Sequence, residues 1–178
     1  YKRQDVADMY VDLSGWAKGL AVDEVAELLE TKDVANYLVE IGGEVRVKGY
    51  NSRKENWAVG IEAPSTSQRV PRSVVRISNT SVATSGDYRN YFEHDGHHYS
   101  HTIDPRTGRP VAHRLAAVTV VHPSAAYADA LATALLVLGP TNGPALAGDL
   151  NIAAYFLVRE NGDVTEITTT AFDTLSTS

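Results

Sequence analysis

Short runs in which apolar and polar residues alternate occur along the chain between positions 37 and 78. The alternation is typical of strands with one buried face, and it predicts strands at Tyr37–Ile41, Glu44–Lys48, Trp57–Glu62 and 74–78. Gly42-Gly43 separates the first two strands and supplies the positive φ that a tight turn or a bulge needs. A Ser/Thr-rich loop at 64–71 separates the last two strands, which we expect to pair in antiparallel fashion.

Apolar residues recur at helical spacing in two other segments. The first covers residues 16–31, after a turn at Ser14-Gly15, and the second covers 125–138 and ends at Gly139-Pro140. A short helix near 143–150 is expected to follow the second segment. Each glycine marks a boundary, because glycine adopts turn and cap conformations that other residues avoid.

The rest of the chain predicts further strands. Residues 116–121 are almost continuously apolar and predict a buried strand, and hairpins are expected around Asp95-Gly96 and Asn161-Gly162. The strands of these hairpins are 89–94 with 97–103, and 152–159 with 164–168 before a polar tail. Because strands and helices mix without β-α-β alternation, we expect an α+β fold with mainly antiparallel sheets, in a single domain spanning 1–178.

Composition narrows the classes of function. The 178 residues carry a net charge of -6, from 16 Lys and Arg against 22 Asp and Glu, so no basic surface for a phosphate backbone is expected and nucleic-acid binding is disfavoured. With 43% hydrophobic and 21% charged residues the chain has a globular composition, and no apolar stretch approaches the length of a transmembrane segment. The absence of cysteine excludes disulfides, thiolate metal sites and cysteine nucleophiles.

Two oxygen-bearing side chains share one face of the second predicted helix. Asp129 and Thr133 are four residues apart, so they lie one turn apart in apolar surroundings. A carboxylate and a hydroxyl suit a hard cation such as Mg²⁺, which keeps positions for water and phosphate. The alternative is that Asp129 interacts with the helix dipole and Thr133 bonds to a carbonyl of its own helix.

A second candidate site is the entrance of the first predicted helix, where Asp12, Gly15 and Lys18 lie close together in the sequence. Free amide groups and the helix dipole favour phosphate at such a position. The alternative is a helix cap followed by a solvated lysine. Gly42-Gly43-Glu44 is equally consistent with a plain turn.

Four histidines, at 94, 97, 98 and 101, lie in the hairpin around Asp95-Gly96. A zinc site of three histidines is disfavoured, because His97 and His101 stand about 13 Å apart along a strand at ~3.3 Å per residue and His98 points to the other face. Only His94 and His97 face each other across the turn. His101, just before Ile103, is best placed to handle a proton or contact a phosphate; the alternative is a structural hydrogen bond.

Five segments, taken together and in order, resemble the ApbE family of FAD:protein FMN transferases. They are Asp12-Leu-Ser-Gly-Trp-Ala-Lys-Gly-Leu-Ala-Val-Asp23, Asn36-Tyr-Leu-Val-Glu-Ile-Gly-Gly-Glu44, Thr84-Ser-Gly-Asp-Tyr88, Tyr99-Ser-His-Thr-Ile-Asp-Pro-Arg-Thr-Gly108 and Asp129-Ala-Leu-Ala-Thr-Ala134. The resemblance runs from about Tyr10 to the C-terminus. It implies a T-fold-like α+β core and Mg²⁺-dependent transfer of FMN from FAD to a Thr or Ser hydroxyl of a flavoprotein, with release of AMP; some members also hydrolyse FAD.

The resemblance also implies roles for individual residues. The metal ligands would be the carbonyl of Gly15 and the side chains of Asp129 and Thr133, and the FAD contacts would be Asp12, Lys18 and Ile103. His101 would be the catalytic or substrate-positioning histidine.

Length is the main departure from the family. Its members carry an N-terminal portion with adenine and flavin contacts, so this chain corresponds to the C-terminal portion and is expected to be less active alone. Members are exported to the periplasm, often lipid-anchored, and their acceptors are electron-transfer flavoproteins. The alternatives are a non-catalytic flavin-nucleotide binding module and, without the resemblance, a generic α+β protein with a surface histidine hairpin.

Overall fold

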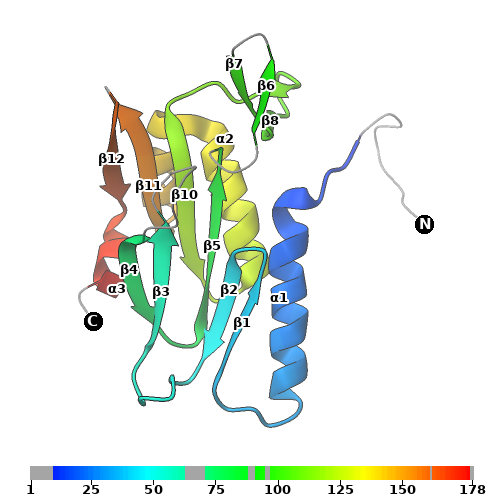
Figure 1. Cartoon of the computed structure of the whole chain (residues 1–178), viewed down its shortest axis with the longest axis vertical. Coiled ribbons are helices and arrows are strands. Elements are labelled where there is room, and N and C mark those ends of the chain that lie inside the picture. The colour runs from blue at the N-terminus through cyan, green and yellow to red at the C-terminus, as the bar shows by residue number, and fades with distance from the viewer. Residues whose placement is uncertain (1–9, 63–70, 88–90, 95–96, 161, 177–178) are drawn as a thin grey trace.

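The computed structural model describes residues 10–62, 71–87, 91–94, 97–160 and 162–176. Its centre is a six-stranded antiparallel sheet (Figure 1). In spatial order the strands are β1 (Tyr37–Ile41), β2 (Glu44–Lys48), β5 (Thr80–Gly86), β10 (Leu115–His122), β11 (Ala153–Glu160) and β12 (Asp163–Thr168). The α+β class with antiparallel sheets is therefore confirmed.

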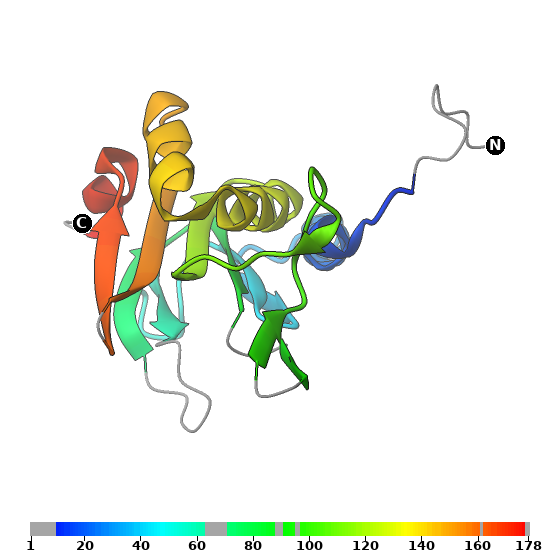
Figure 2. The ribbon, with the colours of Figure 1, turned by 90° about the horizontal axis from the view of Figure 1, so that it is seen from above.

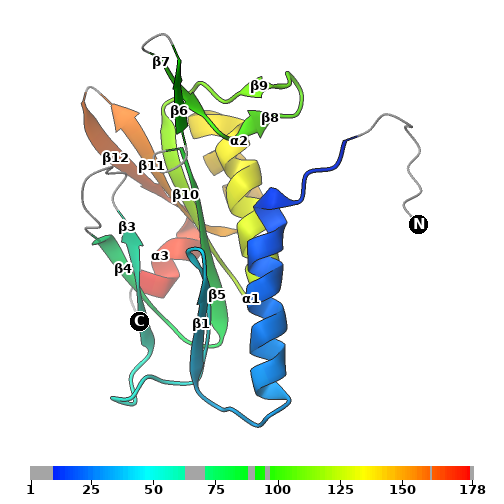
Figure 3. The same cartoon turned by 45° about the vertical axis from the view of Figure 1, so that its right-hand side comes forward.

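Two helices, α1 (Ser14–Glu30) and α2 (Ala125–Asp149), cover one face of the sheet. Figures 1 and 3 show them side by side, and the view from above in Figure 2 shows the hairpin of β3 (Trp57–Glu62) and β4 (Pro71–Ile77) on the opposite side. The expected antiparallel pairing of β3 and β4 is confirmed. Because both faces of the sheet are covered, β10 is buried along almost its whole length, as its apolar sequence predicts.

Three elements were not predicted from the sequence: β5, the two-residue strand β9 (Arg109–Pro110) and a short C-terminal helix. Strand β5 lies between β2 and β10, and its hydroxyl-rich sequence lacks the alternation by which the other strands are recognised. The polar tail expected after residue 168 is instead a short helix, α3 (Thr170–Ser176). Phe172, which is 2% exposed, anchors this helix in the core beside Tyr155, with the two ring centres 5.4 Å apart.

Helix α2 contains the break that Gly139-Pro140 predicts. Gly139 has φ 82° inside the helical span, and the helix continues beyond it, so the short helix expected near 143–150 is the second half of α2. By length and composition alone α2 could also span a membrane, contrary to the sequence-based expectation. In the structure it packs against β5, β10 and β11, where its small residues allow close contact with the sheet.

One carboxylate of α1 joins the two helices. The Asp23 side chain accepts hydrogen bonds from Ser124 Oγ at 2.7 Å and from the amides of Ala125 and Ala126, both at 3.0 Å. These amides belong to the first turn of α2, where no intrahelical acceptor is available. Arg46 Nη1 of β2 lies 2.7 Å from Asp23 Oδ1 on the other side. Asp23 therefore fixes the positions of α1, α2 and β2 relative to one another.

We expect Asp23→Ala to lower the free energy of unfolding by about 3 kcal/mol, because the substitution leaves the largely buried Arg46 guanidinium with only its longer contact to Glu30, at 3.4 Å, and the α2 amides without an acceptor. Urea unfolding followed by circular dichroism measures the loss. Glu27→Ala, on the exposed side of the same helix, is the matched control and should change stability by less than about 0.5 kcal/mol. Equal effects of the two substitutions would contradict this assignment.

The same contact should make stability depend on pH. Burial alone would raise the pKa of Asp23, but hydrogen bonds from Ala126, Ser124, Ala125 and Arg46 outweigh burial and hold the pKa below its usual value. Since the folded-state pKa is lowered, this stabilisation is present above the unfolded pKa of about 3.9 and is lost as the pH falls through the folded pKa. The stability difference between the unaltered chain and Asp23→Asn should therefore shrink below about pH 4. If the stability difference between the two proteins stayed constant down to pH 3, the lowered pKa of Asp23 would be contradicted.

Candidate active site

A cavity of about 1540 Å³ opens where the start of α1 meets α2. Its walls come from the first turns of α1, the turn between β1 and β2, the end of β5, residues 101–108 and one face of α2. The volume exceeds the few hundred to 1,000 Å³ of most small-ligand sites, so a ligand of dinucleotide size can enter. The residues singled out in the sequence all line this cavity: Asp12, Gly15, Lys18, His101, Ile103, Asp129 and Thr133.

The first turn of α1 approaches α2 closely because residue 15 is glycine. A Cβ at Gly15 would lie 2.9 Å from Thr133 Oγ1, so a larger residue would clash with Thr133 unless its side chain or one of the helices shifted. Gly15 also has φ -83° and ψ 16°, which places a kink at the start of the helix. Asp12 precedes the helix and accepts hydrogen bonds from the amide of Ser14 at 2.8 Å and from its hydroxyl at 2.5 Å, which hold the pKa of Asp12 below its usual value.

Asp129 is a buried carboxylate, 3% exposed, that faces this turn. Its Oδ2 accepts a hydrogen bond from the amide of Gly19 at 3.1 Å, although in a regular helix that amide would donate to the carbonyl of Gly15. Burial raises the pKa of Asp129, while the Gly19 amide and the charge of Lys18 lower it in part. Since the α2 amides are capped by Asp23 and Ser124, Asp129 does not act as the simple dipole partner that the sequence left open.

Thr133 lies one turn further along α2. Its Oγ1 is 2.8 Å from Ser85 Oγ on β5, and this cross-element contact replaces the bond to its own helix that the sequence left open. Thr84, next to Ser85, has its Oγ1 2.8 Å from Thr119 Oγ1 on β10. Both β5 hydroxyl residues line the cavity, but the sequence analysis gave them no role, because nothing local indicated that β5 ends there.

Lys18 forms an ion pair, although its side chain stays partly exposed. Its Nζ lies 2.7 Å from Glu44 Oε1, across the turn between β1 and β2. Glu44 is 1% exposed, whereas Lys18 is 46% exposed and lines the cavity. Burial raises the pKa of Glu44, and Lys18 offsets part of that effect. The sequence was equally consistent with a plain turn at Glu44 and did not predict this ion pair. A signal was available in the alternation of Glu44, Arg46 and Lys48, which places three charged side chains on one face of β2.

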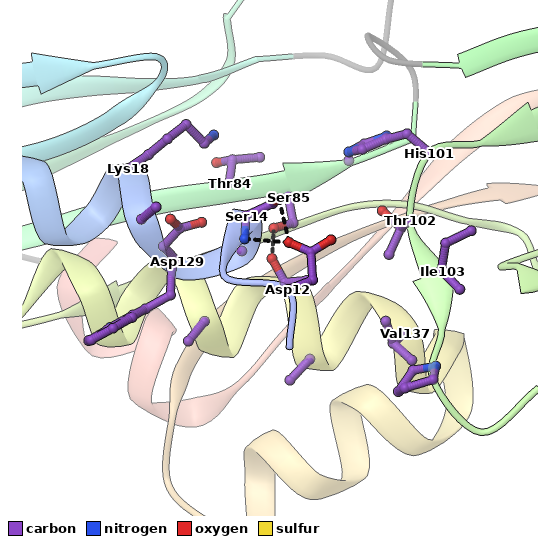
Figure 4. A pocket seen from close by; sticks show the side chains of 18 of the residues that line it. Asp12, Ser14, Lys18, Thr84, Ser85, His101, Thr102, Ile103, Asp129 and Val137 are labelled. Atoms are coloured by element: carbon purple, nitrogen blue, oxygen red, sulfur yellow. Dashed lines mark hydrogen bonds between the residues drawn. The ribbon is translucent and has the colours of Figure 1, made fainter. Parts of the chain in front are cut away.

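His101 and Ile103 form the opposite wall (Figure 4). His101 is exposed, and Ile103 begins β8 (Ile103–Asp104), which pairs with β9 (Arg109–Pro110). Arg106 binds the Asp104 carboxylate through Nε at 2.9 Å and Nη2 at 2.8 Å, which links the two residues across the start of the turn.

The preceding hairpin of β6 (Tyr91–His94) and β7 (His97–Ser100) confirms the predicted pairing, but its second strand ends at Ser100 and not at 103 as predicted. Asp95-Gly96 and the side chains of the histidines at 94, 97 and 98 lie outside the described residues. Within the described part of the chain, no group of three or more His, Asp or Glu side chains could hold a metal ion.

The helix-covered antiparallel sheet, with a large cavity lined by a lysine and by carboxylate and hydroxyl side chains, defines an α+β protein with a candidate ligand site. The chain belongs to the ApbE family, whose family model matches residues 2–156.

The chain is similar to curated proteins that bear the name FAD:protein FMN transferase. The one from Vibrio cholerae is 45% identical over 169 residues, which cover 95% of this chain and 51% of the relative. The one from Escherichia coli K12 is 41% identical over 160 residues, which cover 90% and 46%. This chain therefore spans about half the length of the curated relatives that it matches.

Solved structures agree with this relationship. The apo form of the Pseudomonas stutzeri flavinyl transferase ApbE superposes with a TM-score of 0.83 at 47% identity, covering 94% of this chain and 52% of that one. The flavin transferase ApbE of Vibrio cholerae superposes with a TM-score of 0.85 at 42% identity, covering 97% and 54%. At these identities and coverages, the family's fold is shared over nearly all of this chain.

Proposed function

We propose that this chain forms the metal and pyrophosphate site of an FAD:protein FMN transferase, which moves FMN from FAD to a Thr or Ser hydroxyl of a target flavoprotein and releases AMP. The observation that carries the proposal is the convergence of Gly15, Lys18, His101, Asp129 and Thr133 on one cavity from three separate segments of the chain. The transferases named above, to which the chain is similar, support the same reaction.

The residues on α1 and α2 fit Mg²⁺. They offer a carboxylate of Asp129, the hydroxyl of Thr133 and the carbonyl of Gly15, and Mg²⁺ prefers such oxygen ligands. The Asp129 carboxylate is buried, and its Oδ1 has no hydrogen-bond partner among the residues described. Gly15 departs from helical geometry and lines the same cavity, which supports its carbonyl as a third ligand. When bound, Mg²⁺ would neutralise pyrophosphate charge and polarise the reacting phosphorus.

The other residues of the cavity have separate roles in this proposal. Lys18 binds a phosphate oxygen of FAD, and Asp12 and Ile103 contact the nucleotide. An imidazole nitrogen of His101 accepts the proton of the attacking hydroxyl while the new oxygen–phosphorus bond forms and the bond to the departing AMP breaks. FAD hydrolysis is the same step with water as the attacking group. Incubation with FAD, Mg²⁺ and an acceptor peptide, followed by mass spectrometry, tests the proposal; the expected result is the mass increment of FMN on the peptide.

A second candidate function is a non-catalytic FAD-binding module. Its support is that the chain spans only about half of its curated relatives. The same experiment distinguishes the two candidates, because a binding module would bind FAD but produce neither AMP nor a labelled peptide.

We expect the 178-residue chain by itself to bind FAD weakly and to turn it over slowly. The resemblance implies further adenine and flavin contacts outside the matched region, and positioning of a reacting group contributes several kcal/mol to catalysis. The rim of the cavity is also open, since Tyr10 is 88% exposed and Val11 is 53% exposed. Calorimetric titration of FAD with Mg²⁺ present measures the affinity. Tight binding together with rapid transfer would show that the described cavity suffices.

We further propose a periplasmic location and an acceptor among electron-transfer flavoproteins, both on the strength of the family resemblance. Fractionation of cells that produce the protein, followed by detection of covalent FMN in the periplasmic fraction, tests both. Covalent FMN confined to the cytoplasm would contradict the proposed location.

A further inference from the structure

The proposed mechanism does not use Glu44, although it is a buried carboxylate beside the cavity. Glu44 begins β2 directly after the Gly42-Gly43 turn and is 1% exposed. Its Oε1 contacts Lys18 Nζ at 2.7 Å, whereas its Oε2 is buried without a hydrogen-bond partner in the described part of the chain. A carboxylate removed from water is costly unless a positive charge compensates it. Lys18 provides that charge, so the two residues depend on each other.

The turn between β1 and β2 restrains the same lysine. Gly42 has φ 63°, and a Cβ at this position would lie 3.2 Å from Lys18 Cδ and 3.7 Å from Glu44 Oε2. The aliphatic part of Lys18 therefore lies against the Gly42 backbone, while its ammonium group lies against Glu44. A lysine side chain has many rotamers when free, so two contacts at different points along it reduce the conformations available.

The held ammonium group also lies in the field of a second buried carboxylate. The charge of Lys18 lowers the pKa of Asp129 in part, and the charge of Asp129 raises the pKa of Glu44. Lys18 thus interacts electrostatically with two acidic groups on different elements, and the exposed part of its side chain lines the cavity. Figure 4 shows Lys18 and Asp129 on the same side of the cavity, opposite His101.

We propose that Glu44 is a positioning residue that holds the Lys18 ammonium group at the cavity wall, ready for a phosphate oxygen of the nucleotide. The identity of that nucleotide as FAD rests on the proposed function. Preorganisation increases affinity because the side chain loses less freedom when the ligand binds. Glu44 acts through Lys18 and does not touch the nucleotide itself.

A first experiment measures the position of Lys18 without any nucleotide. In limited acetylation with peptide-resolved mass spectrometry, Lys18 should react about tenfold more slowly than the exposed Lys32 and Lys54, because its Nζ is engaged by a carboxylate at 2.7 Å in a charge-assisted hydrogen bond and its side chain is only 46% exposed. Glu44→Gln should remove most of that difference, while Glu24→Gln on the exposed side of α1 should not. An unchanged rate at Lys18 in Glu44→Gln would overturn the inference.

A second experiment measures FAD affinity by NMR titration, which detects weak binding, for Glu44→Gln, Lys18→Met and the double variant. Each single substitution should weaken FAD binding about tenfold, and the double variant should be no weaker than Lys18→Met alone. If the double variant bound FAD about tenfold more weakly than Lys18→Met alone, the inference would be overturned, because Glu44 would then act independently of Lys18. Circular dichroism monitors folding, and Glu44→Asp, whose shorter side chain draws the carboxylate away from Lys18, replaces Glu44→Gln if that variant does not fold.

The two experiments separate the inference from the proposed function. If the unaltered chain does not bind FAD at all while acetylation responds to Glu44→Gln, the proposed function fails and Glu44 still holds Lys18. If FAD binds and Glu44→Gln changes neither acetylation nor affinity, the inference fails and the proposed function stands.

Discussion

Asp129→Asn should reduce Mg²⁺-dependent FAD turnover by on the order of 100-fold or more, and Asp129→Ala should do the same. Loss of a residue that merely supports a metal ligand costs up to about 100-fold in affinity or activity, and Asp129 is proposed to be the charged ligand itself. Asparagine retains an oxygen that can accept the hydrogen bond from the Gly19 amide, so the helix contact survives while the charge is lost. AMP release from FAD at increasing Mg²⁺ concentrations measures the effect.

The folded state should tolerate these substitutions. Burial raises the pKa of Asp129, so the charged carboxylate is unfavourable in the metal-free protein and its removal should leave the melting temperature unchanged or higher. Mg²⁺ with FAD should raise the melting temperature of the unaltered chain but not that of the variants, since a ligand stabilises only the state that binds it. Asp149→Asn, at the exposed end of α2, is the matched control. Full Mg²⁺-dependent turnover in Asp129→Asn would exclude Asp129 as a ligand.

His101→Asn should slow FMN transfer by on the order of 100-fold, a typical contribution of a positioned acid or base. His101 lines the wall opposite Lys18 and Asp129, where an attacking hydroxyl could approach the phosphate that those residues are proposed to hold. Because His101 is not a proposed ligand of the metal or of FAD, the affinities for both should change little. Single-turnover transfer to an acceptor peptide, with FAD affinity measured separately, distinguishes the two effects.

The control for this prediction is the double substitution of His94 and His97, which pair near the tip of the β6–β7 hairpin. We expect transfer by that variant to stay close to that of the unaltered chain. An inactive double variant combined with an active His101→Asn would move the proton-handling role to the hairpin tip and contradict the proposed mechanism.

Local patterns predicted most of the fold. The bounds of β1, β2 and β3 agree with the predicted ranges, because more buried and less buried side chains alternate along most of each strand and each ends at a turn signal. Strand β5 was not predicted, because its hydroxyl groups form hydrogen bonds with partners on β10 and α2 that no local pattern reveals. Helix α3 was missed because it is too short for a helical period to stand out, and only the burial of Phe172 explains why it forms there.

The candidate site divides in the same way. By itself the sequence determined which side chains share a local face, namely Asp129 with Thr133 on a helix, and Glu44 with alternate residues on a strand, because helical and strand periodicities are local properties of the backbone. Only the tertiary structure decided that Gly19 would meet Asp129 across 110 residues of chain and that Lys18 would be held by Glu44 across 26. Such contacts depend on how helices and sheet pack together, and the hydrophobic burial that drives packing is non-directional, so local spacing cannot specify the partners.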